Sequence, residues 1–152
     1  MTNINDKIEA FELDTDQGKF YSKDHIGKNL VLFFFPKADT TGCTKESISF
    51  SNLISDFENL NTVVVGISKD TIEKQKKFKS KYNLKCILGS DVDIKICSKF
   101  GVWVEKSMYG KKYMGIQRST FLINTEGKIQ QIWNKVKVPG HAEEVLEAVK
   151  KL

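Results

Sequence analysis

Residues 29–46 read NLVLFFFPKADTTGCTKE, and this stretch decides the fold class. The segment from Asn29 to Phe35 is a nearly continuous apolar run that ends at Pro36. A run without polar alternation is typical of a strand buried on both faces, inside a sheet that helices cover on both sides. After Pro36 a short polar loop leads to Cys43, where helical spacing begins. The stretch therefore predicts a central strand, a loop, and a helix with a cysteine in its first turn.

Strand and helix patterns alternate along the rest of the chain. The predicted strands are a hairpin of residues 11–13 and 18–21 that turns across 14–17, the strands 29–35 and 62–68, and the strands 119–124 and 129–133, which are joined at TEGK. The first predicted helix has Phe50, Leu53, Ile54 and Phe57 on one stripe, and the second opens with a capping box of Asp70 and Glu73 and runs to Tyr82. A short helix with Ile94, Cys97 and Phe100 follows, and a last helix carries Ala142, Val145, Leu146 and Val149. Right-handed crossovers make the strands 29–35 and 62–68 parallel neighbours. We assign no element to residues 103–114. This order predicts an α/β, thioredoxin-like fold: a central mixed sheet flanked by helices, with an N-terminal β-hairpin.

Length and composition limit the classes of protein that need considering. With 152 residues, 40% of them apolar, the chain suffices for one core, so we expect a single domain over residues 1–152. The net charge is +5, but Arg118 is the only arginine among 24 basic residues. Scattered lysine is typical of a solvated surface, whereas base-reading proteins rely on arginine, so we expect no nucleic-acid partner. No segment has the composition of a membrane helix or a secretory signal, so we expect a cytoplasmic protein without membrane contact.

The cysteines and histidines argue against metal and disulfide frameworks. Cys43, Cys86 and Cys97 form an odd set without a CxxC pair, which makes a disulfide scaffold or a structural zinc site improbable. The two histidines, His25 and His141, lie far apart in the sequence. We therefore expect no metal and no cofactor, and we expect any chemistry to use a thiol.

Cys43 is the candidate nucleophile because of its position at the start of a helix. Unpaired amides and the helix dipole favour a thiolate there. An unperturbed cysteine is only about 3% ionised at pH 7, so such help matters for reactivity. Arg118 would add positive charge if its strand lies beside the site. A plain core-packing role is the alternative for Cys43, and the polar approach KADTTG argues against it.

A family resemblance gives these residues specific roles. The segment 33–46, FFFPKADTTGCTKE, resembles the active-site loop of the peroxiredoxins, whose motif Pro-x-x-x-Thr-x-x-Cys is matched by Pro36, Thr40 and Cys43. The segments 108–123, MYGKKYMGIQRSTFLI, and 136–146, VKVPGHAEEVL, are similar to the bacterioferritin-comigratory, or Q, subgroup. The resemblance implies a peroxidase that reduces hydrogen peroxide and organic hydroperoxides without metal or organic cofactor.

By the same resemblance, Cys43 is the peroxidatic cysteine, Thr40 orients the peroxide, Pro36 shields the pocket, and Arg118 polarises both thiolate and substrate. The planar donors of an arginine can hold two acceptors at once, which suits this task better than a lysine. A structural ion pair is the alternative for Arg118. Glu46 either steadies Arg118 or the loop, or is an ordinary first-turn acid that the helix dipole favours.

The chain departs from its subgroup in lacking the usual resolving cysteine. The position five residues after Cys43 is Ile48, and the segment of the following helix used by other members, which includes Lys79, has no cysteine. Cys97 shares an apolar stripe and is expected in the core, while Cys86 is a weak candidate resolver. This departure favours a one-cysteine cycle with thioredoxin, glutaredoxin or glutathione as the reductant, and a two-cysteine cycle through Cys86 is the open alternative. The subgroup resemblance suggests a monomer.

Of two other functions, the residues argue against a disulfide reductase and leave a redox sensor open. A disulfide reductase would need CxxC at the loop–helix junction, but Thr40 occupies the first of those positions. A non-catalytic redox sensor or binding module could use the same reactive thiol. Turnover with a reductant separates an enzyme from a sensor. His141, after Pro139-Gly140, is expected to cap or pack at the last helix.

Overall fold

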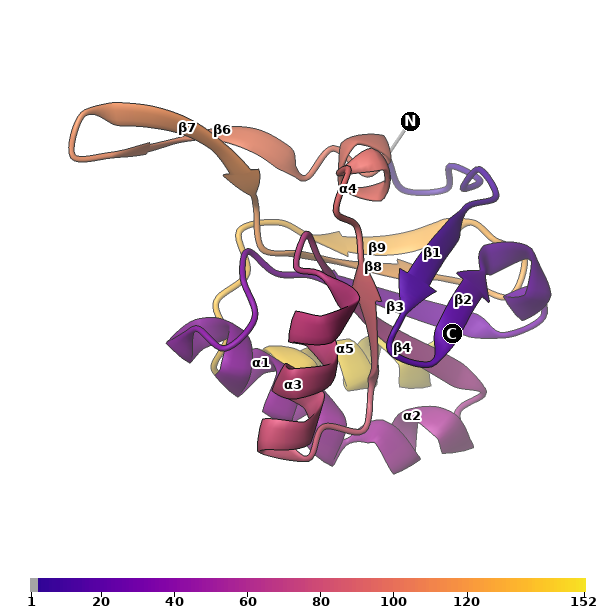
Figure 1. The fold of residues 1–152 in the computed structure, drawn as a ribbon. Helices are drawn as coiled ribbons and strands as arrows, with labels where there is room; N and C mark the ends of the chain where they lie inside the picture. The colour runs from indigo at the N-terminus through magenta and orange to yellow at the C-terminus, as the bar shows by residue number, and fades with distance from the viewer. Residues whose placement is uncertain (1–2) are drawn as a thin grey trace.

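The computed structural model describes residues 3–152 and shows a mixed sheet with helices on one face and a thinner layer on the other (Figure 1). Its elements are β1 (Glu12–Thr15), β2 (Gly18–Tyr21), η1 (Ser22–His25), β3 (Asn29–Phe34), α1 (Thr41–Asn52), α2 (Ile54–Asn59), β4 (Thr62–Ser68), α3 (Ile72–Tyr82), β5 (Ile87–Ser90), α4 (Lys95–Lys99), β6 (Trp103–Met108), β7 (Lys111–Ile116), β8 (Ser119–Ile123), β9 (Ile129–Trp133) and α5 (His141–Lys150). The main sheet has the order β2-β1-β5-β4-β3-β8-β9. The thioredoxin-like prediction is confirmed.

Strand β3 lies inside this sheet, parallel to β4 and antiparallel to β8. Its side chains alternate between two cores. Leu30, Leu32 and Phe34 join the core on one face, while Val31 and Phe33 join the core on the other. Both faces are covered, which explains why the sequence shows an unbroken apolar run. The predicted parallel pairing of the first two buried strands is confirmed.

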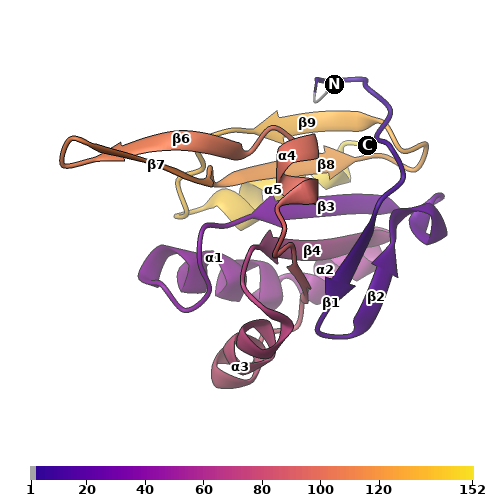
Figure 2. The ribbon, with the colours of Figure 1, turned by 45° about the horizontal axis from the view of Figure 1, so that its top comes forward.

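The helices α1, α2, α3 and α5 contribute to one core, and α4 with the base of the β6–β7 hairpin contributes to the other (Figure 2). The predicted single helix through Phe57 is wrong in one respect. The backbone leaves helical geometry at Leu53, with φ −102° and ψ 6°, so α1 and α2 are separate helices. Phe50 and Phe57 are fully buried, and Leu53 and Ile54 are only half-buried. The stripe therefore packs as predicted although the helix breaks.

The predicted capping box at Asp70 and Glu73 is also wrong. Thr71 is the N-cap of α3, and its hydroxyl accepts a hydrogen bond from the Lys74 amide at 3.3 Å. The carboxylate of Asp70 instead accepts bonds from the Ser68 hydroxyl at 2.6 Å and from the Ala38 amide at 2.8 Å. Asp70 thus fixes the loop that leads to Cys43, and its bond partners lie outside α3.

Most strand bounds agree with prediction within a residue or two, although β1 extends to Thr15 and the hairpin turns across residues 16–17. The strands β5, β6 and β7 and the short 3-10 helix η1 were not predicted, and β6 and β7 form a hairpin over residues 103–116. This hairpin forms a separate two-stranded sheet that reaches away from the body of the molecule (Figures 1 and 2). Within residues 3–152 no helix is long and apolar enough to cross a membrane.

Candidate active site

Cys43 is the third residue of α1 and is almost wholly buried, with 1% of its surface exposed. Thr40 is the N-cap in an extended conformation, and its carbonyl accepts the first helical bond from the Thr44 amide at 2.9 Å. The amides that precede Thr44 belong to the orphan donors of a helix start. The thiol therefore lies at the positive end of α1. It is also shielded from bulk water, and electrostatic interactions are stronger in such a buried position than in water.

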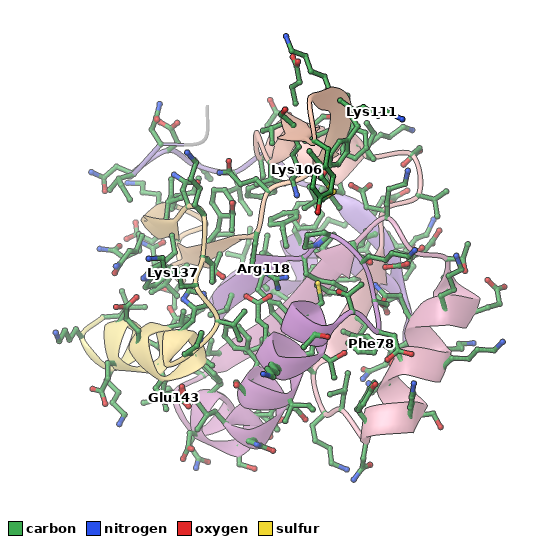
Figure 3. The ribbon with its side chains drawn as sticks, turned by 90° about the vertical axis from the view of Figure 1, so that its left-hand side faces the viewer. Phe78, Lys106, Lys111, Arg118, Lys137 and Glu143 are labelled. Carbon is green, nitrogen blue, oxygen red and sulfur yellow. The ribbon has the colours of Figure 1, made fainter. Side chains whose placement is uncertain are left out.

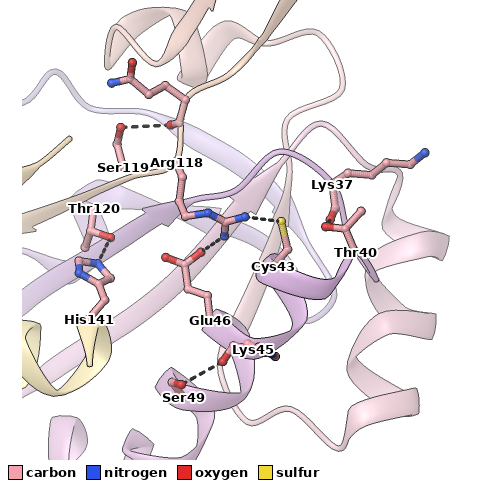
Figure 4. A network of polar contacts seen from close by, with 11 residues as sticks. Lys37, Thr40, Cys43, Lys45, Glu46, Ser49, Arg118, Ser119, Thr120 and His141 are labelled. Carbon is pink, nitrogen blue, oxygen red and sulfur yellow. Dashed lines mark hydrogen bonds and ion pairs between the residues drawn. The ribbon is translucent and has the colours of Figure 1, made fainter. Parts of the chain in front are cut away.

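Arg118 joins the thiol to an acid on the next turn of α1. Its Nη2 donates to Cys43 Sγ at 3.1 Å, and its Nη1 donates to Glu46 Oε1 at 2.6 Å (Figure 4). The sheet register explains why Arg118 reaches this position. Ser119 begins β8 opposite Phe34, so Arg118 lies beside the end of β3 from which the Cys43 loop departs. The guanidinium thus holds two acceptors at once, as the sequence analysis expected of an arginine here.

The charges in this cluster influence one another. Glu46 is 1% exposed, and burial raises its pKa to about 7 although Arg118 opposes that rise. Among the described residues, Glu46 Oε2 has no hydrogen-bond partner, so it can carry the proton. Burial alone would lower the pKa of Arg118, but Glu46 and Cys43 outweigh burial and raise it. Arg118 therefore stays charged while Glu46 changes protonation state near neutral pH.

Gly42 is a site residue that the sequence analysis missed. A Cβ atom on Gly42 would lie 3.2 Å from Arg118 Nη2, the same nitrogen that bonds the thiol. Gly42 has ordinary helical geometry, so backbone strain does not require a glycine there. In the sequence, the only sign of this role is a glycine next to the cysteine. The contact that explains it becomes visible only when the position of Arg118 is known.

The loop before α1 is held at several points. The Thr40 hydroxyl donates to the Lys37 carbonyl at 2.8 Å, which leaves its oxygen available as an acceptor. The Asp39 carboxylate accepts from the Tyr82 hydroxyl at 2.5 Å and from Lys81 at 2.9 Å. Pro36, half-buried, follows β3 directly. Of the predicted residues, Arg118, Cys43 and Glu46 are thus in direct contact at the start of α1. Thr40 is the N-cap of the same helix, and Pro36 lies at the other end of the loop.

Comparison with known proteins agrees with this geometry. Residues 4–132 match the model of the AhpC/TSA family. A putative peroxiredoxin Bcp from Coxiella burnetii is 47% identical over 144 residues, covering 94% of this chain and 95% of the relative. The peroxiredoxin Bcp of Bacillus subtilis is 43% identical over 148 residues, covering 97% and 94%. The chain is a peroxiredoxin of the AhpC/TSA family.

Solved structures of the same subgroup have the same fold. Peroxiredoxin Q of Xanthomonas campestris superposes with a TM-score of 0.89 at 40% identity, covering 93% of this chain and 90% of that one. A PrxQ variant of Xylella fastidiosa superposes with a TM-score of 0.95 at 37% identity, covering 99% and 97%. These matches confirm the predicted subgroup, the thioredoxin-like fold and a thiol peroxidase activity.

The other two cysteines of this peroxiredoxin are unpaired and buried. Cys86 is 1% exposed and packs in the same core cluster as Cys43. Burial raises the pKa of the Cys86 thiol to about 12, so it is a poor nucleophile at neutral pH. Cys97 lies in the other cluster, and burial, then Asp91, raises the pKa of its thiol. The core position expected for Cys97 is confirmed.

At the two positions where the resemblance led us to look for a resolving cysteine, the side chains make other contacts. Ile48 is half-buried and packs against the core. Lys79 forms an ion pair with Asp16 at 2.7 Å, which ties α3 to the turn of the N-terminal hairpin. His141 packs as expected: its Nε2 lies 2.8 Å from the Thr120 hydroxyl, and burial lowers its pKa to about 4. In residues 3–152 no group of three or more potential ligands could hold a metal ion.

Proposed function

We propose that Cys43 is the peroxidatic residue and that it reduces hydroperoxides by direct attack. The thiolate sulfur forms a bond to one peroxide oxygen while the O–O bond breaks. The sulfur is oxidised to a sulfenic acid, and the other oxygen leaves as water or an alcohol after taking up a proton. The observation that carries this proposal is Arg118, which bonds Cys43 Sγ at 3.1 Å while buried Glu46 holds it from the other side.

The remaining site residues have supporting roles in this proposal. Arg118 stabilises the thiolate and the negative charge that develops on the departing oxygen. The open lone pairs of Thr40 accept a hydrogen bond from the peroxide and orient it. Pro36 closes the side of the pocket next to β3. Glu46 fixes the plane of the guanidinium so that one of its nitrogens always points at the sulfur.

We propose both hydrogen peroxide and organic hydroperoxides as substrates. A bacterioferritin comigratory protein of Xanthomonas campestris, 38% identical to this chain, has been described in terms of its alkyl peroxide reduction activity. The reacting group is the same O–O bond in both substrate classes, so the site described above serves either.

For the return half of the cycle we propose a one-cysteine route. The sulfenic acid of Cys43 is attacked by an external thiol, which leaves a mixed disulfide and water, and a second thiol then releases Cys43. Support comes from Cys86 and Cys97, which are buried, un-ionised thiols, and from the absence of cysteine at positions 48 and 79. Of thioredoxin, glutaredoxin and glutathione, we favour glutathione.

The surface beside the loop supports an anionic thiol as reductant. A cavity of about 570 Å³ lies between the loop and α3. Its lining includes Lys37, Lys74, Lys77 and Lys81, together with Asp70 and with Asp39, which pairs with Lys81, so that cations outnumber acids. Glutathione carries two carboxylates, which such a group of ammonium groups would attract. We further propose that residues 1–152 act as one monomeric domain in the cytoplasm. A reducing compartment fits three unpaired cysteines.

Peroxide consumption by single-cysteine variants tests the assignment. Cys43→Ser should abolish turnover, whereas Cys86→Ser and Cys97→Ser should retain it. Full activity in Cys43→Ser would refute the site. Intact mass after one equivalent of hydrogen peroxide then tests the route. A gain of about 16 mass units at Cys43 fits the one-cysteine cycle, while a loss of about two units shared with Cys86 makes Cys86 the resolver after all. Parallel assays with glutathione alone, glutaredoxin and thioredoxin identify the reductant.

A further inference from the structure

The β6–β7 hairpin turns one of its faces toward the active site. Lys106 on β6 lies opposite Tyr113, and Val104 lies opposite Gly115, so these four residues share a face. Lys106 is half-buried, whereas Lys112, which is paired with Ser107 on the opposite face, is exposed. Figure 3 shows the hairpin above the start of α1, with Lys106 on the same side of the molecule as Arg118.

Gly115 provides the space in which the Lys106 side chain lies. A Cβ atom on Gly115 would be 3.2 Å from Lys106 Cδ and 3.5 Å from Lys106 Cε. The aliphatic part of the lysine therefore crosses the backbone of β7 at the one residue on this face without a side chain. An extended lysine would be exposed, as Lys111 and Lys112 near the tip of the hairpin are. This one instead lies along the hairpin.

The ammonium group of Lys106 interacts with the centre of the active site. Burial, and then the charge of Arg118, lowers the pKa of Lys106, while the Cys43 thiolate raises it. Arg118 in turn faces Glu46 from α1 and interacts with His141 from α5. Two cations therefore act on Cys43, Arg118 from the main sheet and Lys106 from the hairpin, and Arg118 is also bonded to Glu46.

We propose that Lys106 is a second cation of the peroxidatic site, placed over Arg118 and Cys43 by the β6–β7 hairpin and by the gap at Gly115, and that it favours the thiolate form of Cys43. Lys106 is a positioning residue here, since no hydrogen bond joins it to the sulfur. The inference rests on the proposed role of Cys43. A half-buried charge is screened by salt less than a surface charge, so the effect should persist at physiological ionic strength.

The test measures thiolate formation without peroxide turnover, so it is separate from the test of the function itself. The rate at which iodoacetamide alkylates Cys43 is followed against pH, with the Cys43 peptide identified by mass spectrometry. Lys106→Met keeps the length of the side chain and removes its charge. We expect the acid limb of its profile to move upward by roughly half a pH unit to one unit, which is three- to tenfold slower alkylation on that limb, with an unchanged plateau.

Two variants serve as controls. Lys106→Arg should follow the wild-type profile, because the charge is kept. Lys112→Met removes a charge from the same hairpin on its other face and should also leave the profile unchanged. A Lys106→Met profile that overlays the wild type would overturn the proposal, and so would an equal shift in Lys112→Met, which would indicate a general surface effect.

Gly115→Val tests the path of the side chain with the lysine still present. Its branched side chain must displace Lys106 Cδ, so we expect the same direction of shift as in Lys106→Met. In the Lys106→Met background, Gly115→Val should add nothing. Additive shifts would contradict the role of Gly115. Thermal unfolding of each variant shows whether the hairpin change has affected the fold, and Lys106→Met alone keeps the proposal testable if Gly115→Val does not fold.

Discussion

Gly42→Ala is the substitution that most directly tests how the active site is held. The new methyl would lie 3.2 Å from Arg118 Nη2, closer than ordinary van der Waals contact, so one of the two must move by a few tenths of an ångström. The guanidinium cannot move freely, because Glu46 holds its Nη1 at 2.6 Å. The displacement therefore falls on the bond from Nη2 to Cys43 Sγ.

The expected cost follows from the strength of that bond. A hydrogen bond to a charged group contributes about 1.5–3 kcal/mol, and weakening it by roughly half removes about 0.8 to 1.5 kcal/mol. If that loss is felt in the transition state, kcat/KM for hydrogen peroxide falls roughly four- to twelvefold. The free energy of unfolding should change little, because alanine is a better helix former than glycine by up to about 1 kcal/mol, and this gain offsets the strain at Arg118. We expect the Tm to stay within about 3 °C of the wild type.

Stopped-flow fluorescence, with Trp103 and Trp133 as reporters, measures the peroxidation rate directly. Thr41→Ala is the matched control, since Thr41 is exposed in the same helical turn and should keep the wild-type rate. A wild-type rate in Gly42→Ala would show that the guanidinium has room to adjust. Equal slowing in both variants would show that the helix start, and not the contact with Arg118, limits the rate.

Three other predictions concern the same charges. Arg118→Lys should lower kcat/KM about 100-fold, because one ammonium cannot reach both Cys43 and Glu46; steady-state peroxide consumption checks this. Glu46 keeps its proton in the folded state up to about pH 7 but loses it near 4.5 when unfolded, so the wild type should lose stability relative to Glu46→Gln as pH rises between these values. The pKa of His141 is lowered to about 4, so this residue costs stability as pH falls from 6.5 toward 4, and His141→Gln should show a weaker acid dependence. Urea unfolding at a series of pH values measures how the free energy of unfolding depends on pH in the wild type and in each variant. Parallel curves for the wild type and a variant would contradict the prediction for that residue.

The sequence predicted the parts of the fold that periodicity determines. The strands β3 and β4 were predicted correctly because they are buried on both faces. Such burial requires an apolar run, which is easily recognised in the sequence. The capping box at Asp70 failed for a physical reason. Its carboxylate accepts a hydrogen bond from the Ala38 amide, 32 residues away, and does not cap the helix. A local sequence pattern cannot show a partner so far along the chain.

The β6–β7 hairpin escaped prediction because it has little core of its own. Along β6 and β7 most residues are exposed or half-buried, so no face is marked by apolar alternation. For the active site, the motif predicted which residues meet but not how they meet. Gly42 and Lys106 could not be found in this way, since each matters only through its distance from Arg118 or Gly115 in three dimensions.

The pairing of β3 with β8 makes the active site depend on the register of the sheet. Arg118 and Cys43 are 75 residues apart in sequence, and they meet because Ser119 pairs with Phe34. A slip of one residue would turn every side chain of β8 to the opposite face, and all five are buried. The core thus opposes such a slip strongly, and it fixes the backbone from which Arg118 extends. The precision of the Arg118–Cys43 contact therefore comes from packing that lies outside the active site. For this reason we expect one added methyl group at Gly42 to lower the reaction rate while the fold remains intact.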